Sequence, residues 1–291
     1  MKFFLTASTK HLHSSLLRHG GAIGRYETYA FADRERGYRL KEDVAGRPII
    51  TIASVLPAPE SLFDLLALQR LISENGASEN VLFVPYLGYA RQDRPNRQGE
   101  ASIGLMILEL LQNTKASRLI LCDVHSDLVR QAFSPSTLEL SALKLFAGVL
   151  AEKPPEVIIA PDAGSVTRTK KLASLLEPQP EIALIDKVRP RPNVAIAKRL
   201  HGNVERKNVL ILDDMIDTGG TLAEAVNLAH EKGARSIRIA ATHGIFSGQA
   251  RARLSQLPVS EILTTNSLPQ IRYPKIRPLD IVPLLLDTLH S

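Results

Sequence analysis

The residues best suited to carry out chemistry lie in one contiguous segment of this 291-residue chain. The apolar residues 209–212 lead into three acids, Asp213, Asp214 and Asp217, which are followed by Thr218-Gly219-Gly220-Thr221. Glycines let backbone N–H groups approach a ligand closely, hydroxyls add donors, and a helix beginning here offers a partially positive N-terminus. The pattern predicts a cradle for a phosphate monoester, with Asp213 and Asp214 at a strand end where they could hold sugar hydroxyls.

A purely structural interpretation of the same segment is a capping box. Thr221 and Glu224 have the spacing of a helix N-cap and its reciprocal partner. Capping accounts for these two residues, but it does not account for the three acids and two glycines that precede them. We therefore favour the phosphate site.

A strongly basic segment lies just upstream of the cradle. Residues 187–208 contain seven Lys or Arg and one acid, and they include Pro190 and Pro192. Because proline disfavours both helix and strand, we predict a mobile basic flap without regular structure. Such a flap could close over an anionic ligand. A solvated basic loop and an RNA contact are the alternatives.

Short apolar runs alternate with longer amphipathic segments along the chain. We predict strands at residues 2–5, 48–54, 80–84, 119–122, 157–160, 182–185, 208–212, 236–241 and 262–265. We predict helices at residues 62–75, 103–113, 141–150, 166–176, 222–232 and 248–257. Several strands are apolar at consecutive positions, which is typical of strands buried on both faces. The alternation indicates an α/β chain with doubly wound parallel sheets, which bind ligands at the carboxyl ends of their strands.

Length, charge and cysteine content narrow the class of protein. A chain of 291 residues, 44% hydrophobic and 23% charged, fits two globular domains, and we expect their junction between residues 141 and 155. The net charge of +6 suits an anionic partner, whereas 5% aromatic residues and no Trp argue against base stacking on nucleic acid. The single cysteine, Cys122, excludes an intrachain disulfide and a thiolate zinc cluster, so we expect a reducing cytoplasm. No apolar run reaches the roughly 18 residues of a membrane helix.

Several motifs, in order along the chain, resemble those of ribose-phosphate pyrophosphokinases. The matching segments are Phe31-Ala32-Asp33-Arg34-Glu35, Arg91-Gln92-Asp93-Arg94, Asp123-Val124-His125, Pro161-Asp162-Ala163-Gly164, Asp186-Lys187-Val188-Arg189-Pro190-Arg191-Pro192-Asn193 and Thr242-His243-Gly244-Ile245-Phe246-Ser247-Gly248. The segment from Asp213 to Thr221 resembles the phosphoribosyl-binding loop of the type I phosphoribosyltransferase fold. One departure is Ser165, which stands where a second glycine usually follows Pro-Asp-Ala-Gly.

The resemblance implies a fold, a reaction and partners. The fold would be α/β, with two type I phosphoribosyltransferase-like domains, each a mostly parallel sheet flanked by helices: residues 1–143, with 276–291 packing back on them, and residues 144–275. The reaction would transfer the β,γ-diphosphoryl group of ATP to the 1-hydroxyl of ribose 5-phosphate, with Mg²⁺ as cofactor, giving 5-phosphoribosyl 1-pyrophosphate and AMP. We expect a homodimer or higher homo-oligomer in the cytoplasm, with no membrane or nucleic-acid partner.

The resemblance also implies roles for particular residues. Lys187 and Arg189 would be catalytic, and His125 and Asp162 would contact magnesium. The ATP-binding residues would be Phe31, Asp33, Glu35, Arg91, Gln92 and His125. Ribose 5-phosphate would be bound by Arg189, Asp213, Asp214, Asp217, Thr218, Gly219, Gly220 and Thr221. Two alternatives keep the fold: a phosphoribosyltransferase, which would lack the ATP site, and a regulatory paralogue, which would lack the catalytic cations.

Overall fold

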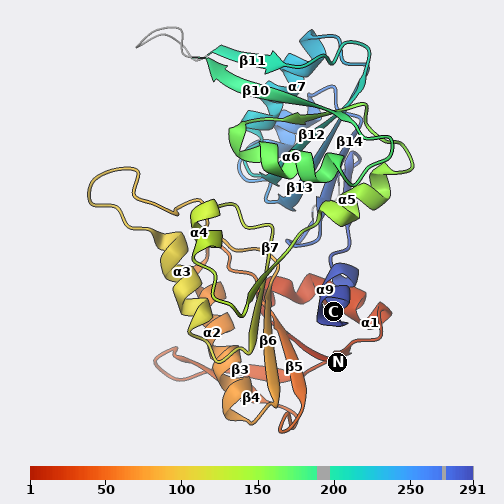
Figure 1. Ribbon diagram of the computed structural model, residues 1–291. Coiled ribbons are helices and arrows are strands. Elements are labelled where there is room, and N and C mark those ends of the chain that lie inside the picture. Colours follow the sequence, from red (N-terminus) through yellow and green to blue (C-terminus); the bar gives the residue numbers. More distant parts are fainter. Residues whose placement is uncertain (189–196, 271–272, 291) are drawn as a thin grey trace. The chain divides into compact units, whose positions relative to one another are not determined.

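The computed structural model describes residues 1–188, 197–270 and 273–290, and it divides into two compact units (Figure 1). The first unit comprises Met1–Ser141, Ser267–Pro269 and Val282–Ser291, and the second comprises Ala142–Asn266 and Gln270–Ile281. Of the segment 276–291, the part from Val282 belongs to the first unit, whereas Ile276–Leu279 pairs as a strand in the sheet of the second. No helix among the described residues is both long and apolar enough to cross a membrane.

The first unit is built on a six-stranded sheet in which every neighbouring pair of strands is parallel. In the order β2-β1-β5-β6-β7-β8, the strands are Ala22–Ile23, Lys2–Leu5, Pro48–Ile52, Glu79–Val84, Arg118–Cys122 and Thr137–Leu140. The helices are η1 (Ala7–Leu12, 3-10), α1 (His13–Arg18), α2 (Pro59–Glu74), α3 (Ile103–Gln112), α4 (Asp127–Gln131) and α9 (Val282–His290). Leu65, Ile107 and Val129, from α2, α3 and α4, are fully or almost fully buried in one core with the central strands.

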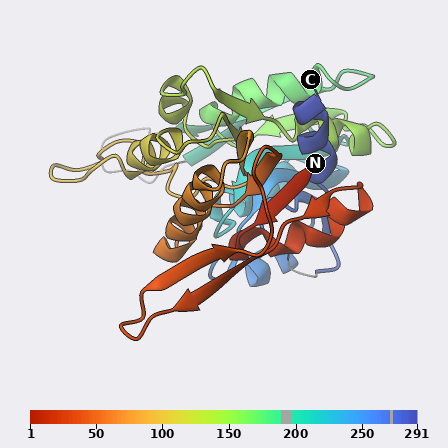
Figure 2. The ribbon, with the colours of Figure 1, turned by 90° about the horizontal axis from the view of Figure 1, so that it is seen from below.

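A two-stranded antiparallel hairpin, β3 (Tyr26–Ala30) and β4 (Arg36–Leu40), extends away from the main sheet of the first unit (Figure 2). It is anchored on α2 by Asp64, whose carboxylate accepts hydrogen bonds from the Arg36 guanidinium and the Tyr38 hydroxyl. Burial, together with the hydrogen bond to Asp64, raises the pKa of Tyr38 to about 12. The hydroxyl therefore keeps its proton at neutral pH and remains a donor.

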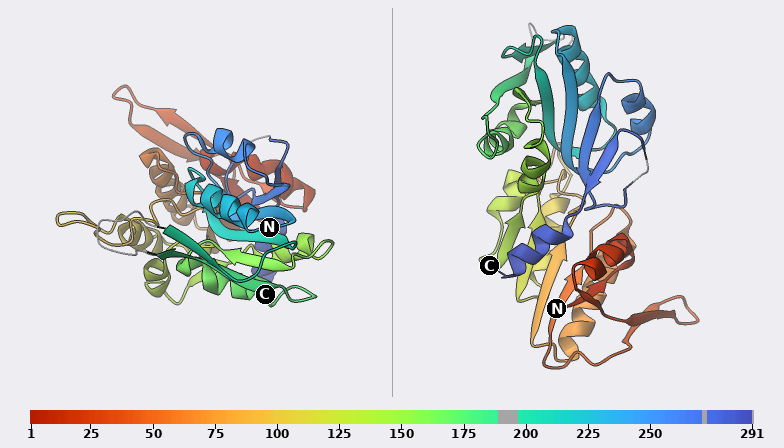
Figure 3. Two further views of the ribbon diagram at one scale, coloured as in Figure 1. Left: turned by 90° about the horizontal axis from the view of Figure 1, so that it is seen from above. Right: turned by 90° about the vertical axis from the view of Figure 1, so that its right-hand side faces the viewer.

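The second unit is built on a seven-stranded sheet that is parallel except for the pair β10–β11. In the order β11-β10-β9-β12-β13-β14-β15, the strands are Ala197–His201, Glu181–Val188, Val157–Ala160, Asn208–Ile216, Ser236–Gly244, Glu261–Thr265 and Ile276–Leu279. The helices are α5 (Leu143–Leu150), η2 (Ala163–Ser165, 3-10), α6 (Val166–Ala173), α7 (Gly220–Glu231) and α8 (Ala250–Ser255). Helices α5 and α6 cover one face of the sheet, and α7 and α8 cover the other (Figure 3).

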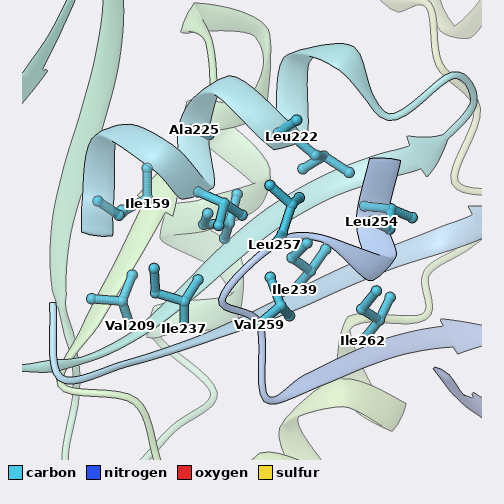
Figure 4. Close-up of a cluster of buried hydrophobic side chains, with 14 of the residues drawn as sticks. Ile159, Val209, Leu222, Ala225, Ile237, Ile239, Leu254, Leu257, Val259 and Ile262 are labelled. Atoms are coloured by element: carbon cyan, nitrogen blue, oxygen red, sulfur yellow. The ribbon is translucent and has the colours of Figure 1, made fainter. Parts of the chain in front are cut away.

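Strand β12, at the centre of this sheet, explains why the sequence there is apolar at successive positions. Val209 and Ile211 belong to the core beneath α7, which includes Leu222 (Figure 4). Leu210 and Leu212 belong to the core on the opposite face. Because both faces are covered, alternation of apolar and polar residues would bury polar side chains on one of them.

The structure confirms the predicted α/β class and corrects the prediction for the basic segment. All nine predicted strands correspond to observed strands, although β10, β12 and β13 are longer; β2, β3, β4, β8, β11 and β15 were not predicted. Absence of regular structure over residues 187–208 is wrong for the described part, since β10 continues to Val188 and pairs antiparallel with β11. Pro190 and Pro192 lie outside the described residues.

Candidate functional site

In the sheet of the second unit, the order in which successive strands are added reverses between β9 and β12. Strand β10 follows β9 on one side, while β12, β13 and β14 lie on the other. Such a switch leaves a crevice at the carboxyl ends of the two central strands, where ligands bind in open α/β sheets. Asp162 follows β9, and Asp213 and Asp214 lie in the last part of β12. The fold therefore brings three predicted site residues to the same edge of one sheet.

The predicted cradle connects β12 to α7. Gly219 caps the helix in the left-handed region, with φ of 72°, which a residue with a side chain would adopt only under strain. In the described part of the chain, the N–H groups of Thr218, Gly219 and Gly220 have no backbone acceptor. They are the donors that an anion at a helix N-terminus would use.

The capping-box interpretation is wrong. Helix α7 begins at Gly220, and its N-cap is Gly219 rather than Thr221. Thr221 is the second residue of the helix and is exposed. Its hydroxyl is therefore not required for capping and is accessible to a ligand.

The chain after β13 supports the cradle from one side. The carbonyl of Ile216 accepts hydrogen bonds from the N–H groups of Ile245 and Phe246, each at 2.9 Å. The Ser247 hydroxyl donates to the carboxylate of Asp217. These contacts hold the last residue of β12, Ile216, and the side chain of Asp217 in place.

The acids beside the cradle repel one another. Burial raises the pKa of Asp213 well above its ordinary value, and the carboxylates of Asp214 and Asp162 raise it further. The Asp214 N–H donates to the Asp213 carboxylate at 2.9 Å. Arg168 of α6 lies 3.6 Å from the carboxylate of Asp214, which is 4% exposed, and partly offsets its charge. A bound cation or a set of hydroxyl donors would relieve the remaining repulsion.

Ser165, the departure from the usual glycine, contacts the predicted magnesium residue. The Asp162 carboxylate accepts hydrogen bonds from the Ser165 N–H at 3.0 Å and from its hydroxyl at 2.8 Å, both to the same oxygen. Asp162 thereby caps the short helix η2. Its orientation is fixed, and its other oxygen takes no part in these two bonds.

The predicted adenine-binding segment forms the end of the hairpin in the first unit. The turn is closed by the Phe31 N–H donating to the Glu35 carbonyl at 2.9 Å, and the Glu35 N–H donates to the Asp33 carboxylate at 3.0 Å. The Phe31 side chain is 53% exposed, with one edge against Tyr29 at 5.3 Å between ring centroids. A large aromatic ring left this exposed at the end of a hairpin is available for stacking.

The other predicted nucleotide residues follow two neighbouring strands of the first sheet. Arg91 and Gln92 are exposed, in the turn after β6, and His125 is exposed after β7. The turn is fixed by its backbone, since the Gln92 N–H donates to Tyr89 and the Gln92 carbonyl accepts from Gly104.

An ion pair holds the backbone just before His125. Glu139 accepts from the Val124 N–H at 2.8 Å and from the Arg130 guanidinium at 2.9 Å, and Arg130 also donates to the Val124 carbonyl. Both backbone groups of Val124 are thus engaged, which limits the positions open to the imidazole of His125.

The predicted catalytic cations fall at the limit of what the structure describes. Lys187 lies in β10, where its backbone is in register with Lys198 of β11. Arg189 lies outside the described residues.

In the second unit, the structure also adds three residues that had no predicted role: Arg168, Ser247 and Arg253. Ser247 lies in one of the family motifs, whereas Arg168 and Arg253 lie on helices beside other basic residues, and the sequence does not single them out.

Two family models match the chain in succession. Residues 1–114 match the N-terminal domain of ribose phosphate pyrophosphokinase, and residues 140–267 match the phosphoribosyl transferase domain. Fold and site therefore define an α/β protein with phosphoribosyltransferase-like architecture.

Relatives of known name extend this match over the full length. Ribose-phosphate pyrophosphokinases of Listeria ivanovii and Corynebacterium ammoniagenes are each 32% identical, over 99% of this chain and 93% of theirs. The crystal structure of phosphoribosylpyrophosphate synthetase from Mycobacterium smegmatis is similar with a TM-score of 0.88 and 31% identity, over 99% of this chain and 97% of that one. The chain belongs to the ribose-phosphate pyrophosphokinase family.

Proposed function

We propose that the protein transfers the β,γ-diphosphoryl group of ATP to the 1-hydroxyl of ribose 5-phosphate, giving 5-phosphoribosyl 1-pyrophosphate and AMP. Membership of the family supports the reaction. The observation that carries the assignment is the Asp213–Thr221 segment, whose adjoining carboxylates and N–H groups without a backbone acceptor among the described residues suit a sugar phosphate. The N–H groups suit the phosphate and the carboxylates suit the sugar hydroxyls, so together they can bind both ends of the molecule.

In this proposal the second unit holds ribose 5-phosphate. Its phosphate accepts hydrogen bonds from the N–H groups and hydroxyls of Thr218, Gly219, Gly220 and Thr221. Asp213, Asp214 and Asp217 accept from sugar hydroxyls. Hydrogen bonds at both ends orient the sugar, so that its 1-hydroxyl attacks from a fixed direction and less entropy is lost in the transition state.

The first unit holds ATP. The exposed ring of Phe31 stacks on adenine, and the carboxylates of Asp33 and Glu35 accept from its amino group or its ribose. Arg91, Gln92 and His125 contact the nucleotide. We also propose that the hairpin end serves the site of a neighbouring copy, which makes a homodimer or higher homo-oligomer the working unit. The reducing conditions of a cytoplasm suit the single buried thiol, Cys122.

The donor set near Asp162 fits Mg²⁺. Magnesium prefers oxygen ligands and usually takes one or two carboxylates, with water and substrate phosphate completing its octahedron. Asp162 presents a fixed carboxylate, and His125 would contact the ion through water or phosphate. Among the described residues, no group of three or more His, Cys, Asp or Glu could hold a metal ion by itself. Bound Mg²⁺ would neutralise phosphate charge during transfer.

Lys187 and Arg189 supply the remaining charge. As phosphoryl transfer proceeds, negative charge spreads over the phosphate oxygens, and positioned cations stabilise it. Lys187 lies in β10, where its backbone is in register with Lys198 of β11. Arg189 in addition contacts ribose 5-phosphate in this proposal.

The test is incubation of the protein with ATP, Mg²⁺ and a panel of pentose phosphates, with AMP and the diphosphorylated sugar measured by chromatography and ³¹P NMR. We expect equimolar AMP and 5-phosphoribosyl 1-pyrophosphate with ribose 5-phosphate, and neither product without a sugar phosphate. A parallel reaction supplies 5-phosphoribosyl 1-pyrophosphate and nucleobases. Pyrophosphate release only in that second reaction would identify a phosphoribosyltransferase, and inactivity in both would identify a regulatory paralogue.

A further inference from the structure

Arg253 reaches the cradle from a different element. It lies on α8, and its Nη1 donates a hydrogen bond to the carbonyl of Thr218. The same nitrogen lies 3.8 Å from the position that a Cβ on Gly220 would occupy. The guanidinium therefore lies against the loop, from the carbonyl at its start to the first residue of α7.

The position of Arg253 is fixed by the packing of α8 against the loop. Ala250 and Leu254, on either side of it in the helix, are 0% and 1% exposed. A Cβ on Gly219 would lie 3.6 Å from the Leu254 side chain and 4.0 Å from that of Ala250. Leu254 is part of the core shared with α7 (Figure 4). Helix α8 and the cradle are therefore one packed structure.

Two physical effects make this contact relevant to an anion. A peptide carbonyl directed at a phosphate repels it, and the hydrogen bond from Arg253 holds the Thr218 carbonyl on the guanidinium instead. The loop also lies beside three acids, which disfavour a dianion. Arg168 offsets Asp214, but its contact is with that carboxylate and not with the loop. Arg253 places a permanent positive charge at the loop itself.

We propose that Arg253 is a positioning residue for the phosphate group of the sugar substrate. It keeps the cradle carbonyl away from the ligand and compensates the charge of the acids beside it. The inference rests on the proposed function for the identity of the sugar phosphate.

The test compares Arg253→Ala with Arg251→Ala, which removes the same charge from an exposed position two residues earlier on α8. Binding of ribose 5-phosphate is measured by calorimetry without ATP, and steady-state kinetics give KM and kcat. For Arg253→Ala we expect the Kd and KM for ribose 5-phosphate to rise at least roughly tenfold, with kcat and the KM for ATP within about threefold of wild type. Arg251→Ala should leave all four constants within about twofold.

Two further measurements separate phosphate recognition from a general loss of structure. Arg253→Lys keeps the charge and a donor, so it should recover most of the affinity. Ribose, which lacks the phosphate, should react weakly but with the same kcat/KM in wild type and in Arg253→Ala. Equal constants for the two alanine variants, or an equal loss with ribose and ribose 5-phosphate, would overturn the proposal. Wild-type protein that forms no AMP would instead refute the proposed function, and competition of inorganic phosphate with a bound probe would still test Arg253.

Discussion

The two units share a strand order but differ at the turn that could bind a ligand. The first sheet reads β2-β1-β5-β6-β7-β8, and the second reads β10-β9-β12-β13-β14-β15 with β11 added beside β10. In each, the first strand is internal, the second lies on one side of it, and the later strands lie on the other. Strands β5 and β12 therefore occupy equivalent places across the change of direction.

The turns after β5 and β12 use their backbone donors in opposite ways. After β5, the N–H of Ser54 donates to the Ser8 hydroxyl at 2.9 Å, that of Val55 to the Tyr86 carbonyl at 2.9 Å, and that of Leu56 to the Ser61 hydroxyl at 2.8 Å. After β12, glycines and acids replace these contacts, and the first N–H groups keep no backbone acceptor among the described residues. The shared topology locates a possible site, and the chemistry of the turn decides whether one forms.

A second difference lies in the hairpins of the two units. In the first unit β3–β4 is a sheet of its own, whereas in the second β10–β11 continues the main sheet. The hairpin end in the first unit carries Phe31, Asp33 and Glu35, which suit a base and a sugar. Strand β10 of the second unit carries Lys187, whose charge suits a phosphate.

The largest effect that this comparison predicts is on catalysis by the second unit. Lys187→Ala removes a cation proposed to act on the transferring group, so we expect kcat to fall by roughly 10²–10³. The KM for ribose 5-phosphate should change only modestly, because the cradle is intact. Initial rates of AMP formation at saturating substrates measure the effect.

The control for this variant is Lys207→Ala. Lys207 belongs to the same basic segment, but its ammonium pairs with Glu181 at 2.7 Å. We expect its kcat to stay within about twofold of wild type. A rate for Lys187→Ala within tenfold of wild type would contradict the proposed role.

Much of the fold was predictable because its central strands are buried on both faces. Strand β12 is apolar from Val209 to Leu212, and that run signals a parallel sheet without knowledge of its neighbours. The strands that were missed lie at edges or in the hairpin. Strand β15 buries only its last residue, Leu279, and β3 buries none fully, so neither has a strong apolar signal.

The cradle was predictable for a different reason, which is that its residues are contiguous. Residues 213–221 carry the acids, hydroxyls and glycines in one run, so the pattern is visible without tertiary structure. The groups that support it are not. Arg168, Ser247 and Arg253 come from α6, the segment after β13, and α8, and only the packing of these elements brings Arg168 to Asp214 and the other two to the loop. The roles of the sugar-phosphate, nucleotide, metal and catalytic residues all stay predictions.

The next largest effect concerns stability as a function of pH. The pKa of Asp213 is raised by burial and by Asp214 and Asp162, from the ordinary value of 3.8. Between the two values the folded protein binds a proton that the unfolded chain has released, so stability falls as pH rises through this window. Asp213→Asn lacks that loss. Without ligands, we expect the variant to be more stable than wild type at pH 8, by a margin that shrinks as the pH falls and is small at pH 4.

Urea unfolding at intervals from pH 4 to pH 8 measures this difference. Asp287→Asn, which removes an exposed carboxylate from α9 of the first unit, corrects for the general effect of one less negative charge. A difference between Asp213→Asn and wild type that does not grow with pH would show that the acids of the second unit are not under strain. The contrast between a charged turn and a neutral one would then lose its electrostatic basis.

The smallest effect tests the turn of the first unit. The Ser61 hydroxyl accepts from the Leu56 N–H and donates to the Ala58 carbonyl, each at 2.8 Å, and the residue is buried. Ser61→Ala leaves that N–H without its acceptor, so we expect about 1 kcal/mol less stability, measured by urea unfolding. Ser73→Ala, the same change at the other end of α2, should cost less. Because the N–H groups of this turn donate within the unit, the KM for ribose 5-phosphate should be unchanged. A change in KM above threefold at unaltered stability would show that the turn of the first unit also serves a ligand. The distinction between the two units would then fail.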